Sequence, residues 1–205
     1  DQWVPYSRND LVPYAPVTEA NLDKGGMTVG ALAEAAQITS DNVAANLLLK
    51  LIGGPAGFTA KLRELGDDVT RLDRYEPEMN FVPAGEIRDT TTPAAMAKLI
   101  MSILDGEALT PRARELLSAW TIGTRTGLDR IRKGLPADWR AGDKTGTASA
   151  DGMPNKHNDV AIVWRPEDFA VVAAYYEAPG SFEKIRAEDN AVLAEVGRIA
   201  ADWLA

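Results

Sequence analysis

The sequence contains no cysteine and a single histidine, His157. Without cysteine the chain cannot form a disulfide, use a thiolate nucleophile or bind a metal through sulfur. One histidine also argues against a catalytic zinc site, which normally combines several side-chain ligands. The chemistry of this chain must therefore use hydroxyls, carboxylates, amines and backbone amides, and we expect neither a metal nor any other cofactor.

Long apolar runs and an excess of positive charge are absent too. No segment approaches the roughly 20 apolar residues that a membrane-spanning helix needs. The formal net charge is −8, whereas binding to nucleic acid relies on clustered Lys and Arg, so we expect no nucleic-acid partner. The chain starts at Asp1 without a signal-peptide pattern, and we interpret it as a processed or truncated product.

Apolar residues recur at helical spacing in the first part of the chain. After an irregular segment over residues 1–24, the spacing predicts helices over residues 28–38, 41–52, 55–65, 92–104 and 111–120. Residues 71–89 have no clean period and contain Pro77, Pro83 and Gly85. A structureless loop of this length within a compact domain is uncommon and usually functional.

The pattern changes in the later part of the chain. Strands are predicted over residues 139–148, 159–164 and 169–176, with residues 149–158 as a hairpin loop that includes His157, and an amphipathic helix over 181–204. Trp139, Trp164 and Trp203 are expected to pack the sheet against this last helix. The sequence thus predicts an α+β fold, with a mainly helical subdomain over residues 1–125 and an antiparallel sheet subdomain with a C-terminal helix over 126–205.

The first polar motif is Ser40-Asp41-Asn42, directly before a predicted helix. All three residue types are common helix N-caps, so capping alone would explain them. In a functional interpretation the Ser40 hydroxyl relays a proton and the Asn42 amide binds an amide of a substrate.

The second motif is Glu76 with Asn80, inside the predicted loop. A base that activates water needs a carboxylate near a fixed water and a second group to orient that water. A carboxylate four positions before a carboxamide can supply both. The alternative is a solvated acidic loop.

The third motif is Lys144-Thr145-Gly146-Thr147 on a predicted strand. A simple alternative is an edge strand whose lysine prevents pairing with another chain, since such strands have this composition. The functional interpretation is an ammonium and two hydroxyls that face a substrate carboxylate, with Gly146 allowing close approach to the backbone.

Together and in this order, the three motifs and their flanking residues resemble a class A serine β-lactamase, from about Tyr6 to the C-terminus. The resemblance implies catalytic roles for Ser40, Glu76, Asn80 and Lys144. It implies substrate-binding roles for Tyr6, Asn42, Thr126, Arg130, Thr145, Gly146 and Thr147, and an ion pair of Arg74 with Asp89 that closes the loop over residues 71–89.

Some of these roles are specific. Arg130 would cross beneath Lys144 and help to bind the substrate carboxylate, and the Thr147 amide would form half of an oxyanion hole. Tyr6 would line the pocket entrance, although an ordinary packing tyrosine explains it nearly as well.

The family's Ser-x-x-Lys nucleophile has no counterpart upstream of Ser40. The only such string, Ser181-Phe182-Glu183-Lys184, follows the last predicted strand, and we interpret Ser181 as a helix N-cap. We therefore expect the nucleophile to lie in a missing N-terminal segment. The chain alone would be inactive, and with that segment it would act as a monomer. The resemblance implies a periplasmic or secreted protein.

The implied function is hydrolysis of a small-molecule β-lactam through an acyl-enzyme. Two alternatives stay open. A penicillin-binding transpeptidase or carboxypeptidase shares the first and third motifs, although such enzymes lack the pair of Glu76 and Asn80. The second is a non-catalytic fragment that folds only with a complementary piece.

Overall fold

A computed structural model describes all 205 residues. Its helices are α1 (Val29–Thr39), α2 (Asn42–Leu51), α3 (Gly54–Glu64), α4 (Pro93–Asp105), α5 (Pro111–Ile122), α6 (Ile131–Gly134) and α7 (Ala187–Leu204). Its strands are β1 (Trp3–Pro5), β2 (Gly26–Thr28), β3 (Arg140–Ala148), β4 (Lys156–Trp164) and β5 (Phe169–Glu177). The fold is α+β, as the sequence predicts.

Local capping signals explain where the early helices begin. The Thr28, Thr92 and Thr110 side chains accept hydrogen bonds from backbone amides at the starts of α1, α4 and α5. Pro93 and Pro111 occupy the first turns of α4 and α5, where a missing N–H costs nothing. The five helices predicted in this part of the chain are all present, with bounds within two residues of those expected.

The largest apolar core lies between α1, α2 and the small sheet of β1 and β2. Leu32 and Val43 are fully buried there, together with Val4, Met27 and Leu47. This core fixes the relative positions of α1 and α2, and therefore of the turn that joins them.

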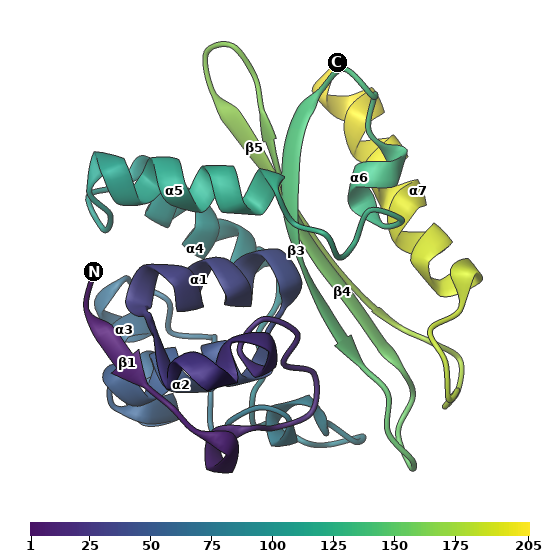
Figure 1. Cartoon of the computed structure of the whole chain (residues 1–205). Coiled ribbons are helices and arrows are strands. Elements are labelled where there is room, and N and C mark those ends of the chain that lie inside the picture. Colours follow the sequence, from purple (N-terminus) through teal and green to yellow (C-terminus); the bar gives the residue numbers. More distant parts are fainter.

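Strands β3, β4 and β5 form an antiparallel meander in that order, with Lys144 opposite Val160 and Thr147 opposite His157. Helices α4 and α5 contact β5 and β3 respectively, whereas α6 and α7 pack together against the sheet. Figure 1 shows the sheet between these two groups, with α1 to α3 to one side of it. No single helix is long and apolar enough to cross a membrane. Helices α2 and α3 together reach the required length and hydropathy, but the chain bends by 71° at their junction.

Several sequence-based expectations are wrong. Strands β1 and β2 lie in or beside the segment expected to be irregular. Strand β4 begins at Lys156, so His157 is a buried strand residue and not part of a loop. Helix α7 begins at Ala187, and Ser181 donates to the carbonyl of Ala150 instead of capping it. Trp203, expected to pack on the sheet, is 83% exposed.

Candidate active site

Ser40 lies in the turn between α1 and α2, with left-handed backbone angles of φ 60° and ψ 38°. The capping role belongs to Asp41, whose carboxylate accepts from the amide of Ala44 at 2.9 Å. The same fully buried carboxylate accepts from the amides of Val17 and Thr18. Because Asp41 holds the turn in place, the Ser40 hydroxyl is left to face the sheet.

Lys144 reaches that hydroxyl from strand β3. Its Nζ donates to Ser40 Oγ at 2.8 Å and to the carbonyl of Thr145 at 2.7 Å. Burial lowers the pKa of Lys144, while the negative charge of Glu76 acts in the opposite direction. An amine with a lowered pKa, in contact with a hydroxyl, can pass a proton along this pair.

The Glu76 side chain contacts Asn80, whose Nδ2 donates to Glu76 Oε2. Asn46 on α2 fixes the Glu76 backbone from both sides, because its Nδ2 donates to the Glu76 carbonyl at 2.8 Å and its Oδ1 accepts from the Glu76 amide at 2.9 Å. Burial raises the pKa of Glu76, although the hydrogen bond from Asn80 and the charge of Lys144 oppose this shift. A positioned carboxylate with a raised pKa is suited to act as a base toward water.

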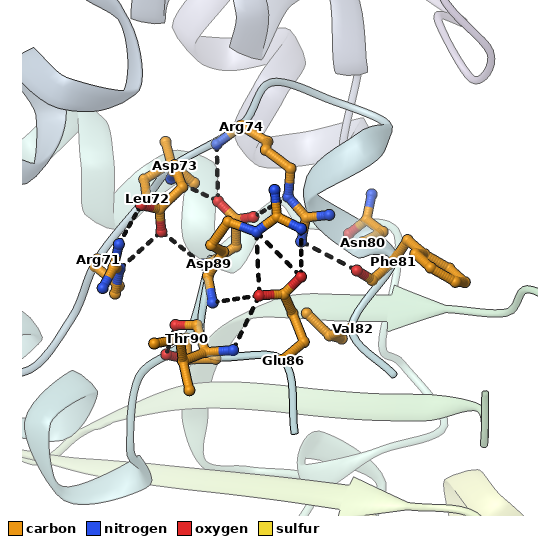
Figure 2. A network of polar contacts seen from close by, with 12 residues as sticks. Arg71, Leu72, Asp73, Arg74, Asn80, Phe81, Val82, Glu86, Asp89 and Thr90 are labelled. Carbon is orange, nitrogen blue, oxygen red and sulfur yellow. Dashed lines mark hydrogen bonds and ion pairs between the residues drawn. The ribbon is translucent and has the colours of Figure 1, made fainter. Parts of the chain in front are cut away.

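The loop that carries Glu76, residues 71–89, is called the Ω-like loop below. Its ends meet in the ion pair of Arg74 Nε with Asp89 Oδ2 at 2.5 Å, where the Asp89 side chain is only 1% exposed. Asp89 Oδ1 accepts from the amides of Asp73 and Arg74, and the Asp73 carboxylate accepts from the Asp89 amide at 3.0 Å. Figure 2 shows this reciprocal network at the base of the loop.

Arg130 is almost fully buried and braces the β3 strand from behind. Its guanidinium donates to the carbonyls of Gly146 at 3.1 Å and Asn158 at 2.7 Å, and to Thr147 Oγ1 at 2.6 Å. Its Nε donates to Asn190 on α7 at 3.0 Å. Burial lowers the pKa of Arg130, so the guanidinium is a poorly solvated cation whose charge is directed toward the third motif.

Thr126 and Gly146 lie beside Arg130 and the third motif and, with them, form one wall of the site. Thr145 Oγ1 donates to Thr126 Oγ1 at 2.9 Å. A Cβ atom added to Gly146 would meet only the Asn158 side chain, at an ordinary 3.4 Å. Protein packing therefore does not require a glycine at this position.

A buried acid pair lies beneath the wall. Asp143 binds Arg132 Nη1 at 2.8 Å, and Asp159 accepts from the amide of Ile131 at 3.0 Å. Burial, together with the charge of Asp143, raises the pKa of Asp159 to about 8. The raised pKa favours a protonated Asp159 at neutral pH, and the hydrogen bond from the Ile131 amide to Asp159 anchors the segment that carries Arg130.

Residues of the three motifs line one cleft of about 570 Å³, a volume within the range of small-molecule sites. Ten of the residues proposed from the sequence line it: Ser40, Asn42, Glu76, Asn80, Thr126, Arg130, Lys144, Thr145, Gly146 and Thr147. A more apolar cavity of about 380 Å³ adjoins the cleft and shares Lys144, Thr145 and Gly146 with it.

The expectation for Tyr6 is wrong. Tyr6 is only 5% exposed and belongs to the core between α1 and α2, where its hydroxyl donates to the Thr18 carbonyl at 2.8 Å. Tyr14, which is 59% exposed and has a left-handed φ of 63°, lines the cleft instead. Tyr14 follows Pro13 as Tyr6 follows Pro5, so no local sequence signal distinguishes the two tyrosines.

Sequence reasoning also missed Asn46, Asn190 and Ile185. Asn46 follows Asn42 by one helical turn, so its spacing in α2 could have marked it as facing the same side. Asn190 and Ile185 line the cleft from the start of α7 and the segment before it, and no local signal distinguishes them.

The model of the β-lactamase enzyme family matches residues 1–204. Among curated proteins, the chain is 48% identical to β-lactamase FAR-1 of Nocardia farcinica over 198 residues, covering 97% of this chain and 61% of that protein. It is 46% identical to β-lactamase AST-1 of Nocardia asteroides over 204 residues, covering 100% of this chain and 64% of that protein. The chain therefore spans less than two thirds of the length of these relatives.

Solved structures agree. The last common ancestor of Gram-negative bacteria class A β-lactamase (GNCA4) superposes with a TM-score of 0.91 at 47% identity, covering 100% of this chain and 76% of that one. The ancestral GNCA class A β-lactamase gives 0.89 at 49% identity, covering 99% and 75%. The chain belongs to the β-lactamase enzyme family, in class A.

Proposed function

We propose that this chain is the larger part of a β-lactam hydrolase that works through a serine acyl-enzyme, with the nucleophilic serine outside these 205 residues. The observation that carries the proposal is the shared cleft of Ser40, Glu76 and Lys144, three residues from distant parts of the sequence. The hydrogen bond of 2.8 Å from Lys144 to Ser40 connects two of the three motifs directly.

In acylation, the serine oxygen attacks the lactam carbonyl and the carbon–nitrogen bond of the ring breaks. The serine proton must reach the ring nitrogen, and the hydroxyl of Ser40, in contact with the Lys144 ammonium, is placed to deliver it. The Thr147 amide would stabilise the developing oxyanion.

In deacylation, Glu76 accepts a proton from a water molecule that Asn80 helps to orient, and the resulting hydroxide attacks the ester carbonyl. The serine oxygen leaves and recovers a proton, which regenerates the enzyme. The raised pKa of Glu76 and the contact with Asn80 support this role. The same pair disfavours a transpeptidase, in which slow deacylation would leave long-lived penicilloyl adducts.

For substrate binding, the hydroxyls of Thr145 and Thr147 and the cations Lys144 and Arg130 would hold the substrate carboxylate. Asn42 would bind the side-chain amide of the β-lactam; its Nδ2 donates to the Pro13 carbonyl at 2.9 Å, which fixes its orientation. We place the protein in the periplasm or outside the cell, as a monomer once the segment with the nucleophile is present.

The proposal is tested with the complete protein and a chromogenic cephalosporin. We expect steady turnover by the complete protein and none by the 205-residue chain alone. Absence of turnover of any penicillin or cephalosporin by the complete protein would refute the proposal.

A further inference from the structure

We infer that Met153 is a positioning residue for deacylation, because it holds the outer part of the Ω-like loop against the hairpin between β3 and β4. This inference rests on the proposed function. The observation behind it is a hydrogen bond from the Val82 amide to Met153 Sδ at 3.3 Å, made by a methionine that is only 1% exposed.

The two halves of the Ω-like loop are attached differently. The first half is fixed to the helices, since Asn46 binds the Glu76 backbone and Thr59 exchanges hydrogen bonds with the backbone of Leu72. The outer half is fixed to the sheet by the contact of Val82 with Met153, the one hydrogen bond between residues 71–89 and residues 149–155.

The hairpin is itself firmly held, so it can act as an anchor. Asn155, also 1% exposed, donates from Nδ2 to the Phe182 carbonyl and accepts the Phe182 amide on Oδ1. Its backbone amide donates to Gly180, and its carbonyl accepts from Ala178. These four hydrogen bonds of Asn155, with those from Ser149 to the Phe182 carbonyl and from Ser181 to the Ala150 carbonyl, join the hairpin to the segment before α7. Met153 extends from this assembly to the Ω-like loop.

The position of Val82 explains why the contact concerns deacylation. Val82 follows Asn80 by two residues, and Figure 2 shows Asn80, Phe81 and Val82 in sequence at the outer end of the loop network. Arg74 holds the Phe81 carbonyl from one side at 3.0 Å, and Met153 holds the Val82 amide from the other. Asn80, which contacts Glu76, is therefore placed by restraints on the residues that follow it.

Loss of the contact should slow deacylation without changing acylation, because neither Ser40, in the turn between α1 and α2, nor Lys144, on β3, takes part in it. In a two-step acyl-enzyme mechanism limited by deacylation, kcat and KM then fall together and kcat/KM is unchanged. A purely structural defect would instead reduce the amount of active protein, lowering kcat and kcat/KM alike with KM unchanged.

The experiment compares three variants of the complete protein. Met153→Ala removes both the sulfur acceptor and the packing; Met153→Leu keeps most of the volume but removes the acceptor. Met101→Leu is the matched control, since Met101 is 48% exposed on α4. Each variant is assayed for steady-state kinetics and for hydrogen exchange at the Val82 amide.

For Met153→Leu we expect Val82 exchange to be faster by roughly threefold to tenfold, the effect of losing one modest hydrogen bond. For Met153→Ala we expect at least this acceleration, with kcat and KM both reduced several-fold and kcat/KM unchanged. Met101→Leu should behave like the wild type. Unchanged Val82 exchange in both Met153 variants, or a fall in kcat/KM equal to that in kcat, would overturn the inference. A wild-type protein without turnover would refute the proposed function itself, and the exchange measurement would still show whether the contact exists.

Discussion

Substitution of Arg74 by alanine should destabilise the protein far more than substitution of Arg88, although both arginines pair with a carboxylate in the Ω-like loop. Arg74 pairs with Asp89, whose side chain is 1% exposed, and is itself only 17% exposed. Arg88 pairs with Glu86 but is 51% exposed. Both pairs lie within residues 71–89, so the comparison changes burial while the loop stays the same.

The expected magnitudes follow from burial. Removing one partner of a buried ion pair leaves an uncompensated charge, which costs about 3–5 kcal/mol. Two backbone amides still donate to Asp89, so we expect the low end of that range, about 3 kcal/mol. An exposed pair contributes roughly 0–1 kcal/mol, so Arg88→Ala should lose less than about 1 kcal/mol.

Urea unfolding of the complete protein, followed by circular dichroism, measures the difference. With a denaturant slope of about 2 kcal/mol/M, Arg74→Ala should lower the unfolding midpoint by about 1.5 M and Arg88→Ala by less than about 0.5 M. Equal losses in the two variants, or a larger loss for Arg88→Ala, would refute the argument from burial.

Two further predictions concern residues outside the three motifs. Asp159 has a raised pKa of about 8, so the folded state keeps a proton that the unfolded state releases. The contribution of this proton to the free energy of unfolding is present at low pH and is lost as pH rises through about 8. Asp159→Asn should therefore reduce the loss of unfolding free energy between pH 6 and pH 9, measured by urea titrations at both values; an unchanged loss would show that the proton is not held there. Tyr6→Phe should cost about 1 kcal/mol of stability, for the lost hydrogen bond to Thr18, and leave KM unchanged, whereas Tyr14→Ala should raise KM with little effect on stability. A raised KM for Tyr6→Phe together with an unchanged KM for Tyr14→Ala, measured by steady-state kinetics beside thermal melts, would show that Tyr6 and not Tyr14 lines the cleft.

The sequence predicted those parts of the fold that depend on local signals. Threonine caps followed by proline mark the starts of α4 and α5, and alternating Val, Ala and aromatic residues mark the sheet. Strands β1 and β2 are only three residues long, too short for a periodic pattern. Helix α7 starts late, after a segment that Asn155 holds through hydrogen bonds to residues 180 and 182, and no local pattern encodes these long-range contacts.

The same distinction applies to the candidate site. The three motifs could be located because each is a short string, and the structure brings them to one cleft. The choice between Tyr6 and Tyr14 could not be made in this way, because both tyrosines lie near prolines and only tertiary packing buries one of them. The acid pair of Asp143 and Asp159 depends on the register of β3 with β4, a long-range property that composition does not reveal.

The most direct test of the central claim is the intact mass of the complete Glu76→Ala protein during reaction with a penicillin. If Glu76 activates the deacylating water, the variant should carry a covalent adduct of the penicillin mass that persists after the wild type has consumed its substrate and returned to its own mass. A variant that shows no adduct and the steady-state turnover of the wild type would contradict the account.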